Sequence, residues 1–138
     1  MKKVLGLGCL AIAACVNIAP KVVADEVWRT EEFNVIYLED RGQTAIWEYG
    51  DGVGYVLLDG LAGEYTDRGT YTGYWVQKSS SRRCDTFRED VTGLPTYHWG
   101  NVEVEFIDKD FPSRWTLKLG ICDQASPIEL NGTPIVSD

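Results

Sequence analysis

Apolar and polar residues alternate most regularly near the C-terminal end of the chain. One alternating run covers residues 102–107, a second covers 114–121, and a polar segment, 108–113, separates them. A period of two is typical of β-strands that have one dry face and one solvated face. These two runs therefore predict an antiparallel hairpin.

The polar connection also predicts the register of this hairpin. If Ile107 pairs with Arg114, the cross-strand neighbours are Phe106 and Trp115, Val104 and Leu117, Val102 and Leu119, and Glu103 and Lys118. The last pair places opposite charges side by side on the solvated face, which is favourable. A slip by one residue would turn every apolar side chain of the hairpin outward.

Shorter runs rich in β-branched and aromatic residues predict earlier strands. These runs cover residues 33–39, 43–49, 54–61 and 69–77. Glycines separate or interrupt them, and no long stretch after residue 25 shows a helical period of about 3.6 residues without glycine. The sequence therefore predicts an all-β domain of about six to eight strands.

Strands of this number can bury their apolar faces either in a closed barrel or between two packed sheets. Gly73, Gly100 and Gly120 lie inside predicted strands, where glycine commonly marks the bends and bulges that close a barrel. We therefore predict a small, single-domain antiparallel barrel. A two-sheet sandwich is the alternative.

Residues 55–58, Tyr-Val-Leu-Leu, are apolar on both faces of their predicted strand. Such a strand is expected to be central and covered on both sides, with the chain ends as a candidate cover. The alternative is an exposed apolar patch that marks an interface.

Alternation within residues 69–77 assigns neighbouring aromatic side chains to opposite faces. Trp75 buries more apolar area than its neighbours and is expected to point into the core. Tyr74 then points outward.

The same alternation places Tyr97 and Trp99 on an outer, acidic face of the strand that leads into residues 102–107. Exposed aromatic rings of this kind stack on sugars or contact cationic partners, so Tyr74, Tyr97 and Trp99 are candidate binding residues. Two alternatives stay open for Trp99: a loop covers it, or a bulge at Gly100 resets the alternation.

The first 24 residues have the features of a secretory signal peptide. Two lysines precede an apolar run, residues 4–16, that is too short to cross a bilayer, and small residues precede a cleavage position after Ala24. We predict that residues 1–24 are removed and that residues 25–138 form one periplasmic or extracellular domain. The alternative is a membrane-anchored lipoprotein acylated at Cys15.

Two cysteines, Cys84 and Cys122, remain in the predicted mature domain under either cleavage hypothesis. Cysteines of exported domains usually pair, so we predict one disulfide. Closing a loop of about 39 residues stabilises a fold by roughly 4 kcal/mol in the loop-entropy model. Two free buried thiols are the alternative.

The charge of the mature domain excludes one class of partner. Cleavage after Ala24 removes three of the 13 basic residues and none of the 21 acidic ones, so ten basic residues face 21 acidic ones and the net charge is −11. Such a surface repels phosphates, and no nucleic-acid partner is expected. Contact with a membrane is expected only if Cys15 is lipidated.

No catalytic, cofactor or metal motif stands out in the sequence. His98 is the only histidine, and its inward position in the alternation is typical of a hydrogen-bonded core side chain. Glu103 and Glu105 share a face, but this face is solvated, whereas a glycosidase needs one desolvated carboxyl group. We therefore expect no enzymatic activity, no cofactor and no metal.

The segment 78–84, Lys-Ser-Ser-Ser-Arg-Arg-Cys, is a locally basic stretch in an acidic domain. A polar loop held by a disulfide can present Arg82 and Arg83 to an acidic ligand or to a protease. A solvated connection between strands is the simpler interpretation.

These features lead to two hypotheses about function. The first is an exported, non-enzymatic binding module that engages a protein or a cell-envelope saccharide through surface aromatic residues and the disulfide-held basic loop. The second is a proteinaceous inhibitor of a secreted hydrolase, either a lysozyme or a protease. The fold class alone does not decide between them.

Overall fold

The computed structural model describes residues 26–136, apart from the side chains of residues 126 and 127. Within this part of the chain all regular secondary structure is β. The strands are β2 (Val27–Arg29), β3 (Asn34–Arg41), β4 (Thr44–Tyr49), β5 (Gly54–Asp59), β6 (Thr70–Gln77), β7 (Arg88–Glu89), β8 (Pro95–Thr96), β9 (Trp99–Phe106), β10 (Trp115–Ile121) and β11 (Gln124–Pro134). The predicted all-β class is confirmed, whereas the predicted signal peptide and Cys15 lie outside the described residues.

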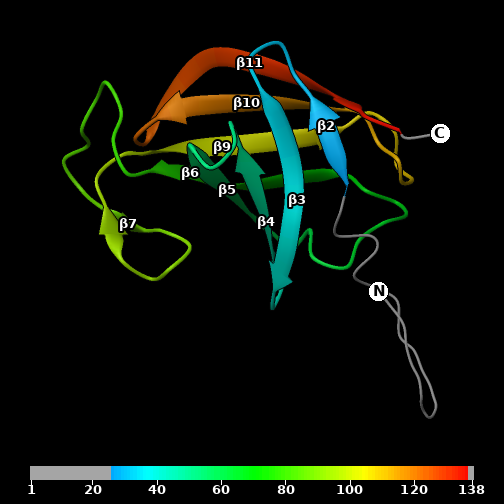
Figure 1. Cartoon of the computed structure of the whole chain (residues 1–138), viewed down its shortest axis with the longest axis horizontal. Helices are drawn as coiled ribbons and strands as arrows, with labels where there is room; N and C mark the ends of the chain where they lie inside the picture. Colours follow the sequence, from blue (N-terminus) through cyan, green and yellow to red (C-terminus); the bar gives the residue numbers. More distant parts are fainter. Residues whose placement is uncertain (1–25, 137–138) are drawn as a thin grey trace.

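Eight of these strands close an antiparallel barrel in the order β10-β11-β2-β3-β4-β5-β6-β9. Most neighbouring strands of the barrel are also consecutive in the chain. The exception is β6, which pairs with β9. The barrel closes where β11 pairs with β2. The segment between β6 and β9, residues 78–98, carries the separate β7–β8 ribbon. Figure 1 shows this segment extending away from the barrel wall at the left. The structure thus confirms the barrel and excludes the two-sheet sandwich.

The predicted C-terminal hairpin is present in the predicted register. Phe106 pairs with Trp115, Val104 with Leu117, Val102 with Leu119, and Glu103 with Lys118. The amide of Ile107 donates to the carbonyl oxygen of Arg114 at 2.8 Å, which closes the hairpin where the sequence places its connection.

Glycine allows close approach of the barrel strands at Gly100. A Cβ atom there would lie 2.0 Å from the carbonyl oxygen of Gly120 and 2.4 Å from Nε1 of Trp75, so no other residue fits. The register between β10 and β11 shifts between Leu119 and Ile121, which places the predicted irregularity at Gly120. The β6–β9 ladder continues regularly through Gly100, so the alternation is not reset there.

Tryptophan side chains fill the centre of the barrel. Trp28, Trp47 and Trp115 are fully buried, and their ring centroids lie 4.6 to 5.6 Å apart. Trp75 belongs to the same core, as the alternation predicts. Offset and edge-on packing of such rings stabilises beyond the area that they bury.

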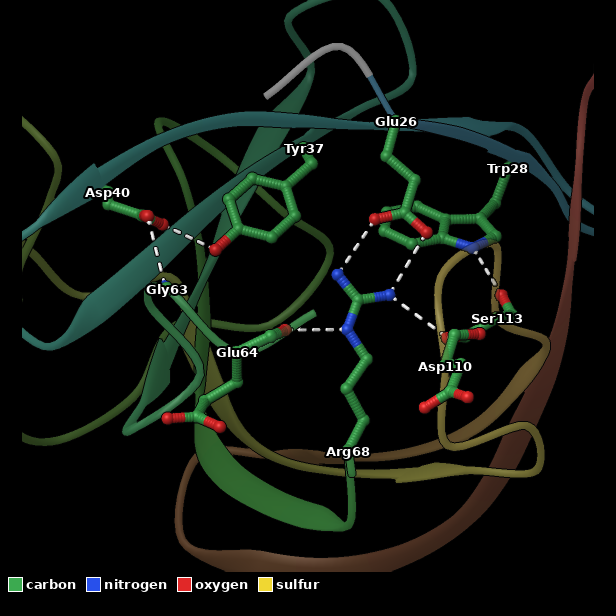
Figure 2. A network of polar contacts seen from close by, with 9 residues as sticks. All are labelled: Glu26, Trp28, Tyr37, Asp40, Gly63, Glu64, Arg68, Asp110 and Ser113. Carbon is green, nitrogen blue, oxygen red and sulfur yellow. Dashed lines mark hydrogen bonds and ion pairs between the residues drawn. The ribbon is translucent and has the colours of Figure 1, made fainter. Parts of the chain in front are cut away.

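A buried ion pair closes one end of the barrel. Arg68 lies in the loop between β5 and β6, and its guanidinium group donates to both carboxylate oxygens of Glu26, at 3.0 and 2.9 Å. Further hydrogen bonds reach the carbonyl oxygen of Glu64 at 2.8 Å and the hydroxyl group of Ser113 at 3.1 Å. Figure 2 shows that these groups come from separate segments and meet at the guanidinium. Arg68 therefore links the start of the described chain, at Glu26, to the β5–β6 and β9–β10 connections.

The same end holds a second polar contact that fixes the loop after β5. Asp40 accepts hydrogen bonds from the hydroxyl group of Tyr37 and from the amide of Gly63, the latter at 3.2 Å (Figure 2). Burial raises the pKa of Tyr37 far above its ordinary value, and the neighbouring carboxylate of Asp40 raises it further. Tyr37 therefore remains a neutral donor at physiological pH.

The outer face of β5 is covered in part, where Cys84 of the 78–98 segment packs beside residues of β6 and β9. Tyr55 and Leu57 pack against a small cluster outside the barrel that contains Val76, Cys84 and Trp99. The cover is therefore not formed by the chain ends. The expectation that this strand is covered on both faces is met only in part, because Tyr55 and Leu57 on the outer face stay half-buried.

Candidate functional site

The barrel contains an apolar cavity of about 360 Å³ at the end opposite Arg68. Its residues come from the end of β4, the beginning of β5 and the end of β6, with Tyr49, Val56 and Gln77 among them. Arg68 instead lies on the β5–β6 connection, and successive connections of an up-and-down barrel alternate between its two ends. The barrel is thus sealed at one end and hollow at the other.

Aromatic and aliphatic side chains line this cavity. The aromatic members are Phe33, Tyr49, Trp47, Trp75 and Trp115, and most of the others are valine, leucine or isoleucine. Small-molecule sites typically have volumes of about 300 to 1,000 Å³ and apolar linings with few polar groups. The cavity falls at the lower end of this range.

Polar and charged groups of the cavity gather toward its mouth. The amide Nε2 of Gln77 donates to the hydroxyl oxygen of Tyr49 at 2.8 Å. Burial raises the pKa of Tyr49 to about 12, and the bond from Gln77 opposes this only in part, so the phenol is neutral at physiological pH. The charged residues of the lining are Glu32 and Glu129, and both are exposed. The deep part of the cavity is therefore uncharged.

The indole N–H groups of the protein fall into two classes. Trp28, Trp75 and Trp99 each donate to a backbone carbonyl oxygen, at 2.7 to 2.8 Å. Trp47 and Trp115 are fully buried, and among the described residues their Nε1 atoms have no hydrogen-bond partner. Both of these tryptophans line the cavity.

The interpretation of Trp99 as an exposed binding residue is wrong. Trp99 points out of the barrel, as the alternation predicts, but it is only 4% exposed. Its indole N–H donates to the carbonyl oxygen of Thr86, and the guanidinium group of Arg88 lies 4.7 Å from its ring centroid. The disulfide at Cys84 holds the connection that covers the ring. The alternative of a covering loop is thus confirmed.

Tyr74 also points outward and helps to hold this connection. Its hydroxyl group donates to the carbonyl oxygen of Glu89 at 2.9 Å, and Arg88 lies 4.7 Å from its ring centroid. Arg88 therefore sits between the rings of Tyr74 and Trp99. Tyr74 is half-buried, and this burial is the main reason that its pKa lies above the ordinary value of a tyrosine.

The other candidate binding residues lie on the outer side of the 78–98 segment. The guanidinium group of Arg83 is 4.0 Å from the ring centroid of half-buried Tyr97, and the ring of Phe87 is 5.9 Å from it. Arg82 and Arg83 are both exposed. The structure brings Arg83 and Tyr97 together, and their role in binding stays a prediction.

The predicted disulfide is present between Cys84 and Cys122, with Cα atoms 5.6 Å apart. It joins the 78–98 segment to the turn between β10 and β11. The amide of Cys84 donates to the carbonyl oxygen of Tyr97, and that of Cys122 to the carbonyl oxygen of Trp99, so backbone bonds reinforce the link. A disulfide is compatible with an oxidising compartment.

A serine and the histidine approach each other in the same segment. Ser80 Oγ lies 2.9 Å from Nδ1 of His98, which is half-buried rather than part of the barrel core. The serine hydroxyl also donates to the carbonyl oxygen of Arg82, and no described carboxylate contacts the imidazole. A hydrolytic triad needs an orienting third group. We interpret this contact as support for the loop.

Residues 26–136 contain neither a candidate metal site nor a membrane-spanning helix. This part of the chain holds no group of three or more histidine, cysteine or acidic residues that could bind a metal ion. It also contains no helix long and apolar enough to span a membrane.

Sequence reasoning missed the cavity and the buried Arg68. Trp47 and Tyr49 share one face of a predicted strand, and this alternation could have marked them as interior aromatic residues. The empty space depends on side chains from strands that are distant in sequence. Arg68 follows an aspartate in a polar loop, a context that gives no sign of burial.

Comparison with known proteins identifies no relative. No protein-family model matches the chain, and no curated protein or solved structure is significantly similar to it.

Proposed function

We propose that this protein is an exported, non-enzymatic binding protein that holds a small, largely apolar molecule in the open end of its barrel. The observation that carries the proposal is the aromatic-lined cavity of about 360 Å³ beside a sealed opposite end. A molecule that enters from the mouth would contact the aromatic side chains that line the cavity.

The size of the barrel is compatible with a ligand site inside it. Protein interiors are close-packed, and a barrel of about eight strands is just wide enough either to be filled by side chains or to hold one small ligand. Empty apolar cavities stay dry and take up apolar molecules. Here the tryptophans fill the sealed half, so space for a ligand remains only toward the mouth.

Export is supported by two separate features. The N-terminal residues have the composition of a signal peptide, and the Cys84–Cys122 disulfide is compatible with an oxidising compartment.

Filling the cavity is expected to abolish binding. In Leu117→Trp the larger side chain occupies the space beside Trp115, so the affinity for the fluorescent probe N-phenyl-1-naphthylamine should fall at least about tenfold. The matched control is Leu94→Trp, because Leu94 is 63% exposed on the 78–98 segment. Probe fluorescence measures both affinities. No binding to the unmodified protein, or equal binding by both variants, would contradict the proposal.

A second candidate function uses the outer side of the 78–98 segment. Phe87 and Leu94 are 54% and 63% exposed there, and Arg82 and Arg83 are exposed on the same disulfide-held segment. Apolar side chains beside arginines are typical of protein interfaces. This arrangement favours a protein partner, such as a secreted hydrolase that the segment would inhibit. A saccharide partner is less favoured, because stacking on Trp99 would require that its ring is exposed.

The inhibitor hypothesis predicts a loss on substitution of the arginines. If the segment blocks trypsin or lysozyme, Arg82→Ala or Arg83→Ala should raise the inhibition constant at least about tenfold, because an interface arginine is often a dominant contact. Arg29→Ala, at an exposed position on β2, is the matched control. Titration of each enzyme with the purified protein measures the constant. Absence of inhibition by the unmodified protein argues against this function.

A further inference from the structure

Strand β11 extends beyond the strand that pairs with it on one side. It covers Gln124–Pro134, but β2 pairs with it at Thr133 and Pro134. The β2–β3 hairpin turns back after Arg29, which pairs with Asn34. Figure 1 shows β11 continuing to the left, well past the short β2. Within the described part of the chain, no strand pairs with the rest of β11 on this side.

The backbone of Glu129 faces this open side. In an antiparallel strand the N–H and C=O groups of one residue point to the same side, and those of the next residue point to the opposite side. The amides of Asn131 and Ile135 point toward the β2–β3 hairpin, where they donate to Glu31 and to the carbonyl oxygen of Val27. Glu129 lies two positions before Asn131 in a regular part of the strand. Its N–H and C=O groups therefore point to the same side, where β11 has no strand partner.

A side chain occupies the place of the missing strand at Asn131. The carboxylate of Glu31, at the tip of the β2–β3 hairpin, accepts hydrogen bonds from the backbone amide of Asn131 and from its side-chain Nδ2, both at 3.0 Å. One carboxylate oxygen thus takes the position that a carbonyl oxygen of a paired strand would have. The edge is capped at Asn131, and no described strand continues this cap past Glu129.

The open edge borders the mouth of the apolar cavity. Ile128 and Leu130 of β11 line this cavity, as do Glu32 and Phe33 of the hairpin tip. Ile128 pairs with Leu119, which also lines the cavity, so its side chain lies on the inner face of the sheet. It is nevertheless 43% exposed. The cavity therefore opens sideways, next to the edge of β11.

These two features together fit an extended polypeptide. A strand edge with unpaired N–H and C=O groups accepts a further strand, and pockets for alternate side chains then give specificity. A strand added beside β11 would direct every second side chain to the inner face, toward Ile128, Leu130 and the mouth of the cavity. A small molecule without a row of backbone amides would leave this edge to water.

The charges around the edge favour a basic segment. Glu31 and Glu32 lie at the hairpin tip, and Glu129 lies on the strand, with all three exposed. Lys118 is the cross-strand neighbour of both Glu129 and Glu103, so it stands between two carboxylates. This surplus of negative charge attracts lysine or arginine on the outer side of an added strand. A second copy of the chain is disfavoured, because it would bring the same carboxylates together.

We propose that the edge of β11 at Glu129 binds an extended, basic segment of a partner protein, which adds a strand to the barrel and places an apolar side chain in the mouth of the cavity. The backbone of Glu129 holds the segment, basic side chains lie on the outer face with Glu129, and apolar side chains face Ile128 and Leu130. This inference goes beyond the proposed function, because it does not require that a small molecule binds.

The experiment uses the fluorescein-labelled heptapeptide Lys-Val-Lys-Phe-Lys-Val-Lys, and fluorescence anisotropy measures its affinity. N-methylation of a peptide bond removes one donor and changes no side chain. In the proposed pairing a lysine lies opposite Glu129, so the lysine amides donate to β11 and the valine amides point to solvent. N-methylation of the two lysines beside phenylalanine should weaken binding at least about tenfold, whereas N-methylation of the two valines should weaken it by less than about twofold.

Substitutions test the edge from the side of the protein. Glu129→Pro removes the N–H group that faces the open side, a position at which proline is tolerated in an edge strand. The affinity for the heptapeptide should fall at least about tenfold. The matched control is Glu129→Gln, which keeps this N–H group and removes the charge, so the loss should be about two- to fivefold and should vanish at high salt. Thermal unfolding of each variant checks that the barrel is intact.

The outcomes separate this inference from the proposed function. The inference is overturned if the heptapeptide does not bind, if both N-methylation patterns have equal effects, or if Glu129→Pro keeps the affinity. Binding of N-phenyl-1-naphthylamine judges the proposed function independently. Binding of the peptide without binding of this probe would overturn the proposed function alone, and the reverse result would overturn the inference alone.

Discussion

Replacement of Arg68 by methionine is expected to lower the free energy of unfolding by about 3 to 5 kcal/mol, because it leaves the buried carboxylate of Glu26 without a counter-charge. Both side chains are almost completely buried, at 0% and 2% exposure. The substitution also removes the bonds to Glu64 and Ser113 that join two loops at the sealed end. Urea denaturation, followed by circular dichroism, measures the loss.

The matched control is Arg114→Met. Arg114 forms a similar pair with Asp108, at 2.8 Å, and this bond lowers the pKa of Asp108 to about 2, but both side chains are substantially exposed. The change in stability should be a small fraction of that in Arg68→Met. Glu26→Gln combined with Arg68→Met should recover part of the loss, since no buried charge remains. Equal losses in the two single variants would show that Arg68 does not seal the barrel.

Removal of the disulfide is expected to cost about 2 to 5 kcal/mol and to uncover Trp99. The two cysteines are 38 residues apart in the chain, so the link excludes many conformations of the unfolded state. In Cys84→Ser combined with Cys122→Ser, the 78–98 segment loses its covalent link and keeps only its non-covalent contacts, which include the bond from Trp99 to Thr86 and the packing of Arg88 on Tyr74 and Trp99. Denaturation measures stability, and acrylamide quenching of fluorescence measures exposure of the indole.

A second substitution assigns the quenching signal. The additional quenching caused by loss of the disulfide should disappear when Trp99→Phe is introduced, because Trp28, Trp47, Trp75 and Trp115 lie in the barrel core. Unchanged quenching in the serine variant would mean that the segment covers Trp99 without help from the disulfide.

Part of the fold was predictable from patterns within single segments and from the number of cysteines. The register of β9 and β10 follows from alternation, because a shift by one residue reverses the face of every side chain. The inward position of Trp75 follows from the same rule. The disulfide followed from the two cysteines that remain in a domain predicted to be exported.

The burial of Trp99 could not be decided from its own strand. Alternation gives the correct outward direction, but exposure depends on the return of residues 84–88 over the ring. This return depends on the disulfide with Cys122 and on the contacts of Arg88, which join positions distant in sequence. A period of two describes which face a side chain occupies and carries no information about what covers that face.

The candidate site was not predictable for a related reason. A cavity is the difference between the volume of the barrel and the volume of its inward side chains, which come from every part of the chain. Trp28, Trp47 and Trp115 fill the half next to Arg68, whereas the half lined by Val56 and Leu117 is not filled. Each strand taken alone has the same apolar inner face. Only the closed barrel distinguishes the packed half from the hollow one.

The proposed function requires that an apolar molecule binds inside the open end of the barrel. Methyl resonances in ¹³C-labelled protein, recorded during titration with pentylbenzene, test this claim directly. We expect saturable shifts at the methyl groups of Val56, Leu117 and Leu130, which line the cavity, and none at Leu94 on the outer segment. Shifts confined to Leu94 and Val91, or no saturable shifts, would contradict it.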